Sequence, residues 1–189
     1  MGCRQGKQKS AANGPENLDT IPEPSTPPPV DPRLPINARQ VFKLKKSWKG
    51  IKRNMEATGV EMFIRLFRNN NELISLFKDF KDITSVDDIT RENEALEHHA
   101  LLVMSVIDEA ICHIDEVDRV IELCTRVGAT HSRFTGFTSD LFWNMEEPFL
   151  ASVKLILGDR YSDSMDVIYQ LTIKFILSNL TKGFKAASS

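Results

Sequence analysis

The chain has 189 residues, somewhat more than one average domain, and 41% of them are hydrophobic, which is enough for a real core. Its 24 lysines and arginines against 26 acidic residues give a net charge of -2, which argues against nucleic-acid binding through bulk positive charge. No run of about 18 apolar residues predicts a membrane-spanning helix, and no apolar run behind the first charges predicts a secretory signal. Three scattered cysteines cannot form a disulfide framework, so we expect a reducing compartment.

The first 36 residues differ in composition from the rest of the chain. They hold eight of the nine prolines and no aromatic residue. Such a segment cannot bury enough apolar surface to offset the entropy lost on ordering. We therefore predict a disordered arm, partly in polyproline II conformation, over residues 1–36.

The arm begins with a sequence that suits lipid attachment. After removal of Met1, Gly2 could carry myristate and Cys3 could carry palmitate, and basic residues follow closely. Two acyl chains with basic residues would make a stable membrane anchor, whereas one chain gives only marginal binding. Gly6 stands where the usual motif has serine or threonine, so a chance Met-Gly start on a disordered tail remains the alternative.

From residue 37 onward the chain has one proline and six glycines, a composition that permits long helices. Apolar side chains recur at intervals of three or four, which is the helical period. The clearest stripes are Val41, Leu44, Trp48 and Ile51; Val60, Phe63 and Phe67; Val117, Val120, Cys124 and Val127; and Met165, Ile168, Thr172 and Phe175. No alternating strand pattern competes. We predict an all-α domain of seven or eight helices over residues 37–184, a short turn at 158–160 and a disordered tail at 185–189.

Two of the four histidines fall where a ligand could be held. In a helix over residues 91–111, His98 points toward solvent and His99 lies at the margin of the apolar face. His131 ends the apolar stripe that contains Val127. Two imidazoles from two apolar faces could bind a metal inside a flat hydrophobic cofactor. Periodicity alone favours two separate core histidines that bond to backbone carbonyls.

Four residues taken together, in this order and at these spacings, indicate a protein family more specifically than any one of them does. They are Trp48, Phe77, His99 and His131. Phe77 and His99 are 22 residues apart, and His99 and His131 are 32 apart. From about residue 37 to 184 the chain resembles the globin family, most closely its neuroglobin and globin-X branch. The resemblance implies a globin fold around haem b (iron protoporphyrin IX).

Carried onto this sequence, the resemblance implies specific roles for several residues. His131 would be the proximal iron ligand and His99 the distal histidine, with Phe77 stacked on the porphyrin and Val103 on the ligand side. The second nitrogen of His131 should donate to the carbonyl of Val127, one turn earlier. Aromatic side chains would bury the ring, and these are Phe63, Phe67, Phe77 and Phe142.

The function that this resemblance implies is reversible binding of dioxygen or another diatomic gas. His99 could stay off the iron and donate a hydrogen bond to the gas, or it could bind iron until it swings away. The branch favours the second role, and a polar loop at residues 81–90 would let the distal helix slide.

A lipid anchor and bis-histidyl iron favour redox sensing or electron transfer over oxygen storage. We therefore expect a cytoplasmic protein, held at the inner face of the plasma membrane if it is acylated, with a redox partner and without enzymatic activity. The alternative from a different class is a helical signalling or scaffold module that binds no haem.

Overall fold

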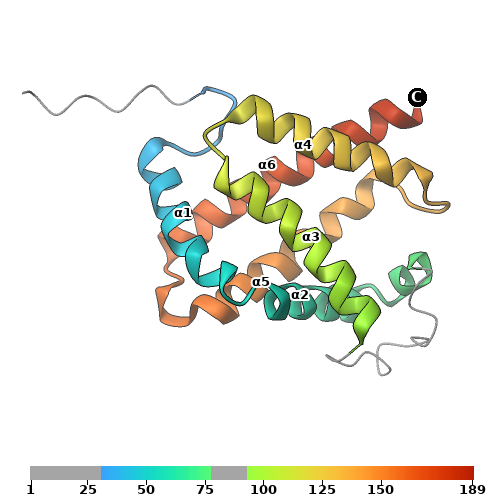
Figure 1. Ribbon diagram of the computed structural model, residues 1–189, viewed down its shortest axis with the longest axis horizontal. Helices are drawn as coiled ribbons and strands as arrows, with labels where there is room; N and C mark the ends of the chain where they lie inside the picture. Colours follow the sequence, from blue (N-terminus) through green and yellow to red (C-terminus); the bar gives the residue numbers. More distant parts are fainter. Residues whose placement is uncertain (1–30, 78–92) are drawn as a thin grey trace, which may run out of the picture.

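The computed structural model describes residues 31–77 and 93–189, which form α-helices and 3-10 helices and contain no strand (Figure 1). The α-helices are α1 (Ala38–Lys52), α2 (Met55–Asn69), α3 (Glu94–Cys112), α4 (Val117–Thr130), α5 (Glu146–Leu157) and α6 (Asp163–Ser188). The 3-10 helices are η1 (Asn71–Leu76), η3 (His131–Arg133), η4 (Ser139–Met145) and η5 (Gly158–Arg160). The predicted all-α class and the predicted turn at 158–160 are confirmed.

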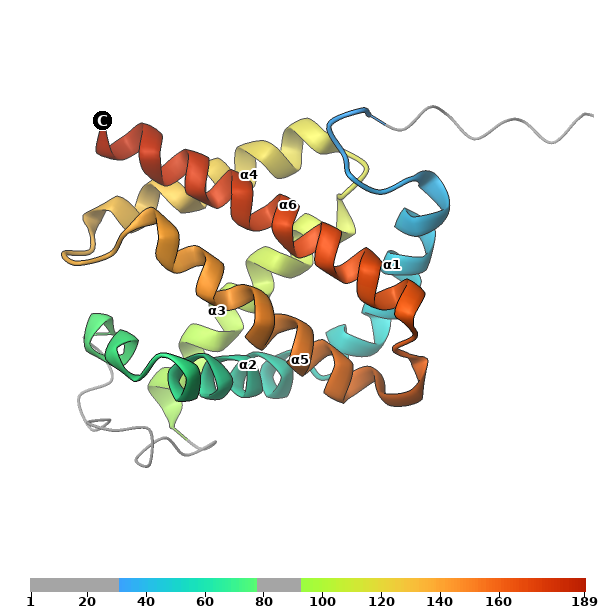
Figure 2. The same cartoon turned by 180° about the vertical axis from the view of Figure 1, so that it is seen from behind.

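The helices are arranged in two crossed layers. Helices α3 and α4 lie in one layer and α5 and α6 in the other, as the two opposite views show (Figures 1 and 2). Helix α1 closes one end, and η1 with the loop after α4 lies at the opposite end. The apolar stripes predicted from the sequence fill the space between the layers, with Leu44, Trp48, Phe67 and Ile168 at most 2% exposed.

Glycines allow α4 and α6 to cross at very short range. A Cβ atom on Gly128 of α4 would overlap the backbone carbonyl of Leu180, and one on Gly183 of α6 would overlap that of Thr125. Backbone atoms cannot give way as a flexible side chain can, so glycine is required at both positions. Gly128 lies three residues before His131, and this crossing therefore fixes the end of α4 at which His131 stands.

The ordered domain is longer at both ends than the sequence predicted. Leu34 and Ile36 are buried in the core, and Arg33 forms ion pairs with Asp31 and with Asp118. The predicted boundary at residue 37 is thus too late, because two apolar side chains are enough to tie this short segment to the domain. The predicted disordered tail is also wrong, since α6 continues to Ser188 through alanines, which favour helix.

The rest of the predicted arm, with Gly2 and Cys3, lies outside the described residues, and so does the polar loop at 81–90. Among the residues that are described, no helix is long and apolar enough to span a membrane.

A buried tryptophan links α1 to α3. The indole nitrogen of Trp48 donates to Oδ1 of Asp108 at 2.8 Å, and Nζ of Lys52 donates to Oδ2 of the same carboxylate at 2.7 Å. Burial by itself raises the pKa of Asp108, but the hydrogen bonds from Lys52 and Trp48 outweigh this and leave the pKa below its usual value. The carboxylate therefore stabilises the contact between α1 and the helix that carries His99.

We predict that Asp108→Asn lowers the free energy of unfolding at pH 7 by about 1–2 kcal/mol, since a hydrogen-bonded charge is lost. The pKa of Asp108 is lower in the folded protein than in the unfolded chain, where it is about 4. The stability that the carboxylate contributes is therefore complete above about pH 4 and is lost as the pH falls through the pKa of the folded protein. Urea unfolding at decreasing pH should therefore show the difference between variant and wild type shrinking below about pH 4.

Asp115→Asn is the matched control, because Asp115 also pairs with a lysine of α1, Lys45, but is more exposed. It should cost less than about 0.5 kcal/mol. A cost for Asp108→Asn that is equally small, or independent of pH, would contradict the role assigned to Asp108.

Candidate functional site

His131 stands at the end of α4, where its ring is oriented by the backbone. Its Nδ1 lies 2.9 Å from the carbonyl oxygen of Val127, as the sequence predicted. A carbonyl only accepts, so Nδ1 carries the hydrogen and Nε2 keeps a free lone pair. Burial lowers the pKa of His131 below its ordinary value, although the bond to Val127 acts in the opposite direction. The imidazole is therefore neutral near pH 7 and can act as a metal ligand through Nε2.

Aromatic rings surround His131. Its ring centroid lies 4.9 Å from that of Phe142 and 5.0 Å from that of Phe137. Phe137 and Phe142 also contact each other and Phe184 of α6. Of these three phenylalanines, the sequence reasoning named only Phe142. Phe137 was missed because it lies in a loop, where no helical period marks it, although it follows Phe134 at an interval of three.

His99 is the centre of a second aromatic cluster. Its ring meets Phe63 of α2 and Phe77, just after η1, in edge-to-face contacts with centroids 5.1 Å and 5.0 Å away. Phe67 packs against both of these phenylalanines. His99 is half-buried while its neighbour His98 is exposed, as the sequence predicted. Val103, one turn along α3 from His99, is half-buried and packs against the core.

The predicted aromatic set is thus divided between the two histidines. Phe63, Phe67 and Phe77 gather around His99, whereas Phe142 lies against His131. Phe77 follows η1 and Phe137 lies in the loop after α4, and both of these segments lie at the end of the molecule away from α1 (Figures 1 and 2). The structure therefore has two aromatic walls, each of which carries one imidazole.

This chemistry fits an iron porphyrin. Imidazole is a common axial ligand of haem iron, and aromatic side chains suit the burial of a flat apolar ring. No group of three or more histidine, cysteine or acidic side chains in residues 31–77 and 93–189 could hold a bare metal ion.

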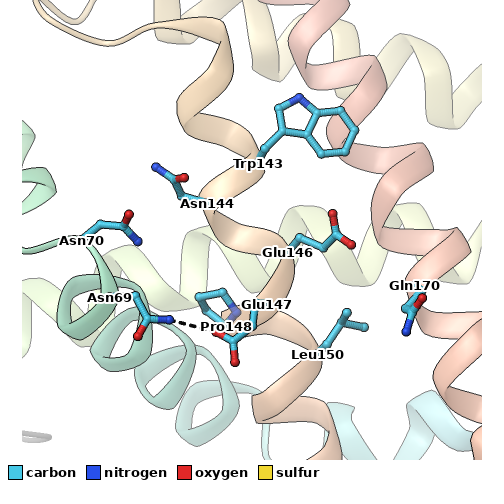
Figure 3. A pocket seen from close by; sticks show the side chains of 9 residues that line it. All are labelled: Asn69, Asn70, Trp143, Asn144, Glu146, Glu147, Pro148, Leu150 and Gln170. Atoms are coloured by element: carbon cyan, nitrogen blue, oxygen red, sulfur yellow. Dashed lines mark hydrogen bonds between the residues drawn. The ribbon is translucent and has the colours of Figure 1, made fainter.

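An open hollow of about 570 Å³ lies elsewhere, where α2, α5 and α6 come together (Figure 3). Six of its nine lining residues are polar, with Glu146, Glu147 and Gln170 among them, and the amide of Asn69 donates to Glu147 at 2.9 Å. Neither His99 nor His131 lines it. This hollow offers no imidazole to an iron porphyrin, so the candidate site remains the pair of aromatic walls.

Comparison with known proteins gives the family. The family model for globins matches residues 60–178, which is more than half of the chain. The chain belongs to the globin family. The matched span contains His99 and His131 together with the aromatic residues around them, Phe184 excepted. Membership argues against a helical scaffold module without haem.

The relatives of this globin include proteins named neuroglobin. It is 27% identical to the neuroglobin of Chaenocephalus aceratus and 26% identical to that of Danio rerio, in each case over 141 residues that cover 75% of this chain and 87% of the other. Its fold matches the crystal structure of a hexacoordinated heme protein from an anhydrobiotic tardigrade, with a TM-score of 0.77 and 34% identity. That match covers 82% of this globin and 99% of the tardigrade protein.

Proposed function

We propose that this haem-binding globin holds the iron of haem b between His131 and His99, and that a diatomic gas such as dioxygen binds once His99 has moved away. The observation that carries the proposal is the state of His131, a neutral imidazole whose Nδ1–H is engaged by Val127. The second aromatic wall supports a role for His99, because it presents another imidazole among Phe63 and Phe77.

His131 is the fixed ligand in this proposal. The hydrogen bond to Val127 sets its tautomer and the direction of the ring, and it raises the basicity of Nε2. Phe137 and Phe142 contact the imidazole and bury part of it. The crossing of α4 with α6 at Gly128 restrains the backbone just before His131.

His99 is the exchangeable ligand. Its contacts with Phe63 and Phe77 are edge-to-face, a type of contact worth only about 0.5–1.5 kcal/mol each beyond burial. When bound, haem supplies an iron that takes up a diatomic gas and exchanges single electrons. Val103 lies one turn along α3 from His99 and belongs to the same side of the site.

A globin whose histidine must leave before gas can bind is suited to sensing or electron transfer more than to bulk storage. Its apparent gas affinity is the affinity of the open form multiplied by the fraction of molecules in which the position is open. The affinity is therefore low when few molecules are open. We propose accordingly that this globin works with a redox partner and is not itself an enzyme.

Carbon monoxide binding to the reduced protein tests the exchange. If His99 must leave first, the observed association rate reaches a ceiling as the concentration of carbon monoxide rises, because departure of His99 becomes limiting. A rate that increases in direct proportion to concentration throughout would contradict the proposal.

We further propose that the protein is cytoplasmic and is anchored to the inner face of the plasma membrane through acyl groups on Gly2 and Cys3. The supporting observation is the Met1-Gly2-Cys3 start with basic residues close behind. Labelled myristate should be incorporated into protein with its native N-terminus expressed in eukaryotic cells, and Gly2→Ala should prevent this. Absence of label from the native protein would exclude the anchor.

A further inference from the structure

Positive charge is concentrated on one helix of this globin. The segment from Ala38 to Arg53, which is α1 and its C-terminal cap, carries seven lysines and arginines and no acidic residue. The whole chain has a net charge of -2, so the remaining residues together carry -9. The composition of the whole chain does not show this separation, because its basic and acidic residues are nearly equal in number.

Four of these cations lie together on the outer surface of α1. Val41, Leu44, Trp48 and Ile51 form its buried side. At about 100° per residue, Arg39, Lys46, Lys49 and Arg53 fall within an arc of about 80° on the opposite side. All four side chains belong to exposed residues, and none forms an ion pair with another described residue, whereas Lys45 and Lys52 at the edges pair with Asp115 and Asp108.

An exposed phenylalanine lies in the middle of this arc. Phe42 is 67% exposed and is the most exposed large apolar side chain among the residues that the structure describes. We call Phe42 and these four cations the basic face of α1. Exposure of an aromatic ring to water is unfavourable, and cations around such a ring suit the anionic surface of a membrane, where they attract lipid headgroups.

We propose that the basic face of α1 docks on a bilayer that contains anionic phospholipid, and that it does so independently of any acyl chain. The cations would meet the lipid phosphates and carboxylates while Phe42 enters the boundary between headgroups and acyl chains. This assignment concerns a surface of the fold and does not depend on how the iron is ligated.

A hollow beside the basic face favours lipid over an acidic protein as the partner. It has a volume of about 300 Å³ and lies between α1 and the end of α3. Trp48, Ile111 and Cys112 form its apolar part, and Lys45, Lys49 and Lys52 complete the lining. An apolar recess among ammonium groups suits part of an acyl chain below its anionic headgroup, because one lipid molecule supplies both groups at the short separation found here.

The location of α1 gives the docking a functional consequence. Helix α1 lies at the opposite end of the molecule from η1 and the loop after α4, where the two aromatic walls are found (Figures 1 and 2). A globin that rests on the bilayer through α1 would therefore keep the end with His99 and His131 toward the aqueous side. Gas and a soluble redox partner would reach that end without obstruction by the membrane.

Co-sedimentation with lipid vesicles tests the proposal. The protein is the full chain with Gly2→Ala, so that no acyl chain contributes to binding. The vesicles contain phosphatidylcholine alone or phosphatidylcholine mixed with phosphatidylserine. We expect binding to the mixed vesicles only, and a decrease of binding as salt is added.

The decisive variant is Arg39→Gln/Lys46→Gln/Lys49→Gln/Arg53→Gln. It should weaken binding to the mixed vesicles by at least about 100-fold, since each cation near an anionic surface contributes about fivefold. The matched control is Arg68→Gln/Arg126→Gln/Lys154→Gln/Lys185→Gln, which removes four exposed cations from four other helices and changes the net charge equally. The control should lose no more than about threefold, and Phe42→Ala alone about tenfold.

Three outcomes would overturn the proposal. The first is binding to the mixed vesicles that is no stronger than binding to phosphatidylcholine alone. The second is an equal loss in the two quadruple variants, which would mean that net charge alone acts. The third is equally tight binding to soluble polyglutamate with no effect of Phe42→Ala on vesicles, which would identify an acidic protein as the partner.

Discussion

Replacement of His131 by glycine is expected to abolish stable haem binding. After reconstitution and gel filtration, the ratio of haem to protein should fall at least tenfold below that of the wild type, because the fixed iron ligand is gone. Phe137 and Phe142 would still bury part of the ring, but apolar contact alone does not hold iron in a defined position. Quantitative absorption spectroscopy of the eluted protein measures this ratio.

Two controls separate ligation from folding. His98→Gly changes an exposed histidine on α3 and should leave the haem content unchanged. Free imidazole added to His131→Gly should restore haem binding, since it can occupy the place of the missing ring and ligate the iron. Retention of haem by His131→Gly with an unaltered spectrum would refute the role of His131.

Replacement of His99 by leucine is expected to change the coordination of the iron and to accelerate gas binding. The reduced, gas-free variant should lose the spectrum of six-coordinate iron, because leucine offers no lone pair. If the wild-type position is open in about 1–10% of molecules, carbon monoxide should associate about 10- to 100-fold faster with the variant. The ceiling on the association rate should disappear as well.

His98→Leu is the matched control for this second substitution, since it changes the neighbouring, exposed histidine to the same residue. It should leave both the spectrum and the association rate as they are in the wild type. Stopped-flow measurement of carbon monoxide binding to both variants gives the comparison. An unchanged reduced spectrum in His99→Leu would mean that His99 stays off the iron and acts only as a hydrogen-bond donor.

The helical period was sufficient to predict much of this fold. It identified the buried sides of α1, α4 and α6, and it correctly separated the exposed His98 from the half-buried His99. Once the resemblance had assigned His131 as an iron ligand, the helical period also indicated the carbonyl of Val127 as its partner, because a residue four positions earlier in a helix lies directly below. These are local consequences of a regular backbone.

Contacts between segments that are distant in the sequence could not be predicted in this way. The period gives no indication that Phe142 belongs with His131 while Phe63 and Phe77 belong with His99. The crossing of α4 and α6 at Gly128 and Gly183 is another example, because each glycine is explained only by the backbone of the other helix.

Irregular and terminal segments were the other source of error. Disorder was predicted for residues 1–36 from their Pro-rich composition, yet Leu34 and Ile36 are buried. Composition is an average over a segment, so it does not show that two apolar side chains within it contact the core. Phe137 was missed because a loop has no period. The concentration of cations on α1 was overlooked because the net charge of the whole chain is small.

We expect that His131 and His99 both bind the iron when no gas is present. The most direct test is the optical absorption spectrum of the purified, haem-loaded protein, reduced and free of gas. Ligation by both histidines predicts sharp, resolved visible bands, which indicate six-coordinate low-spin iron. A single broad visible band would indicate an open sixth position and would contradict it.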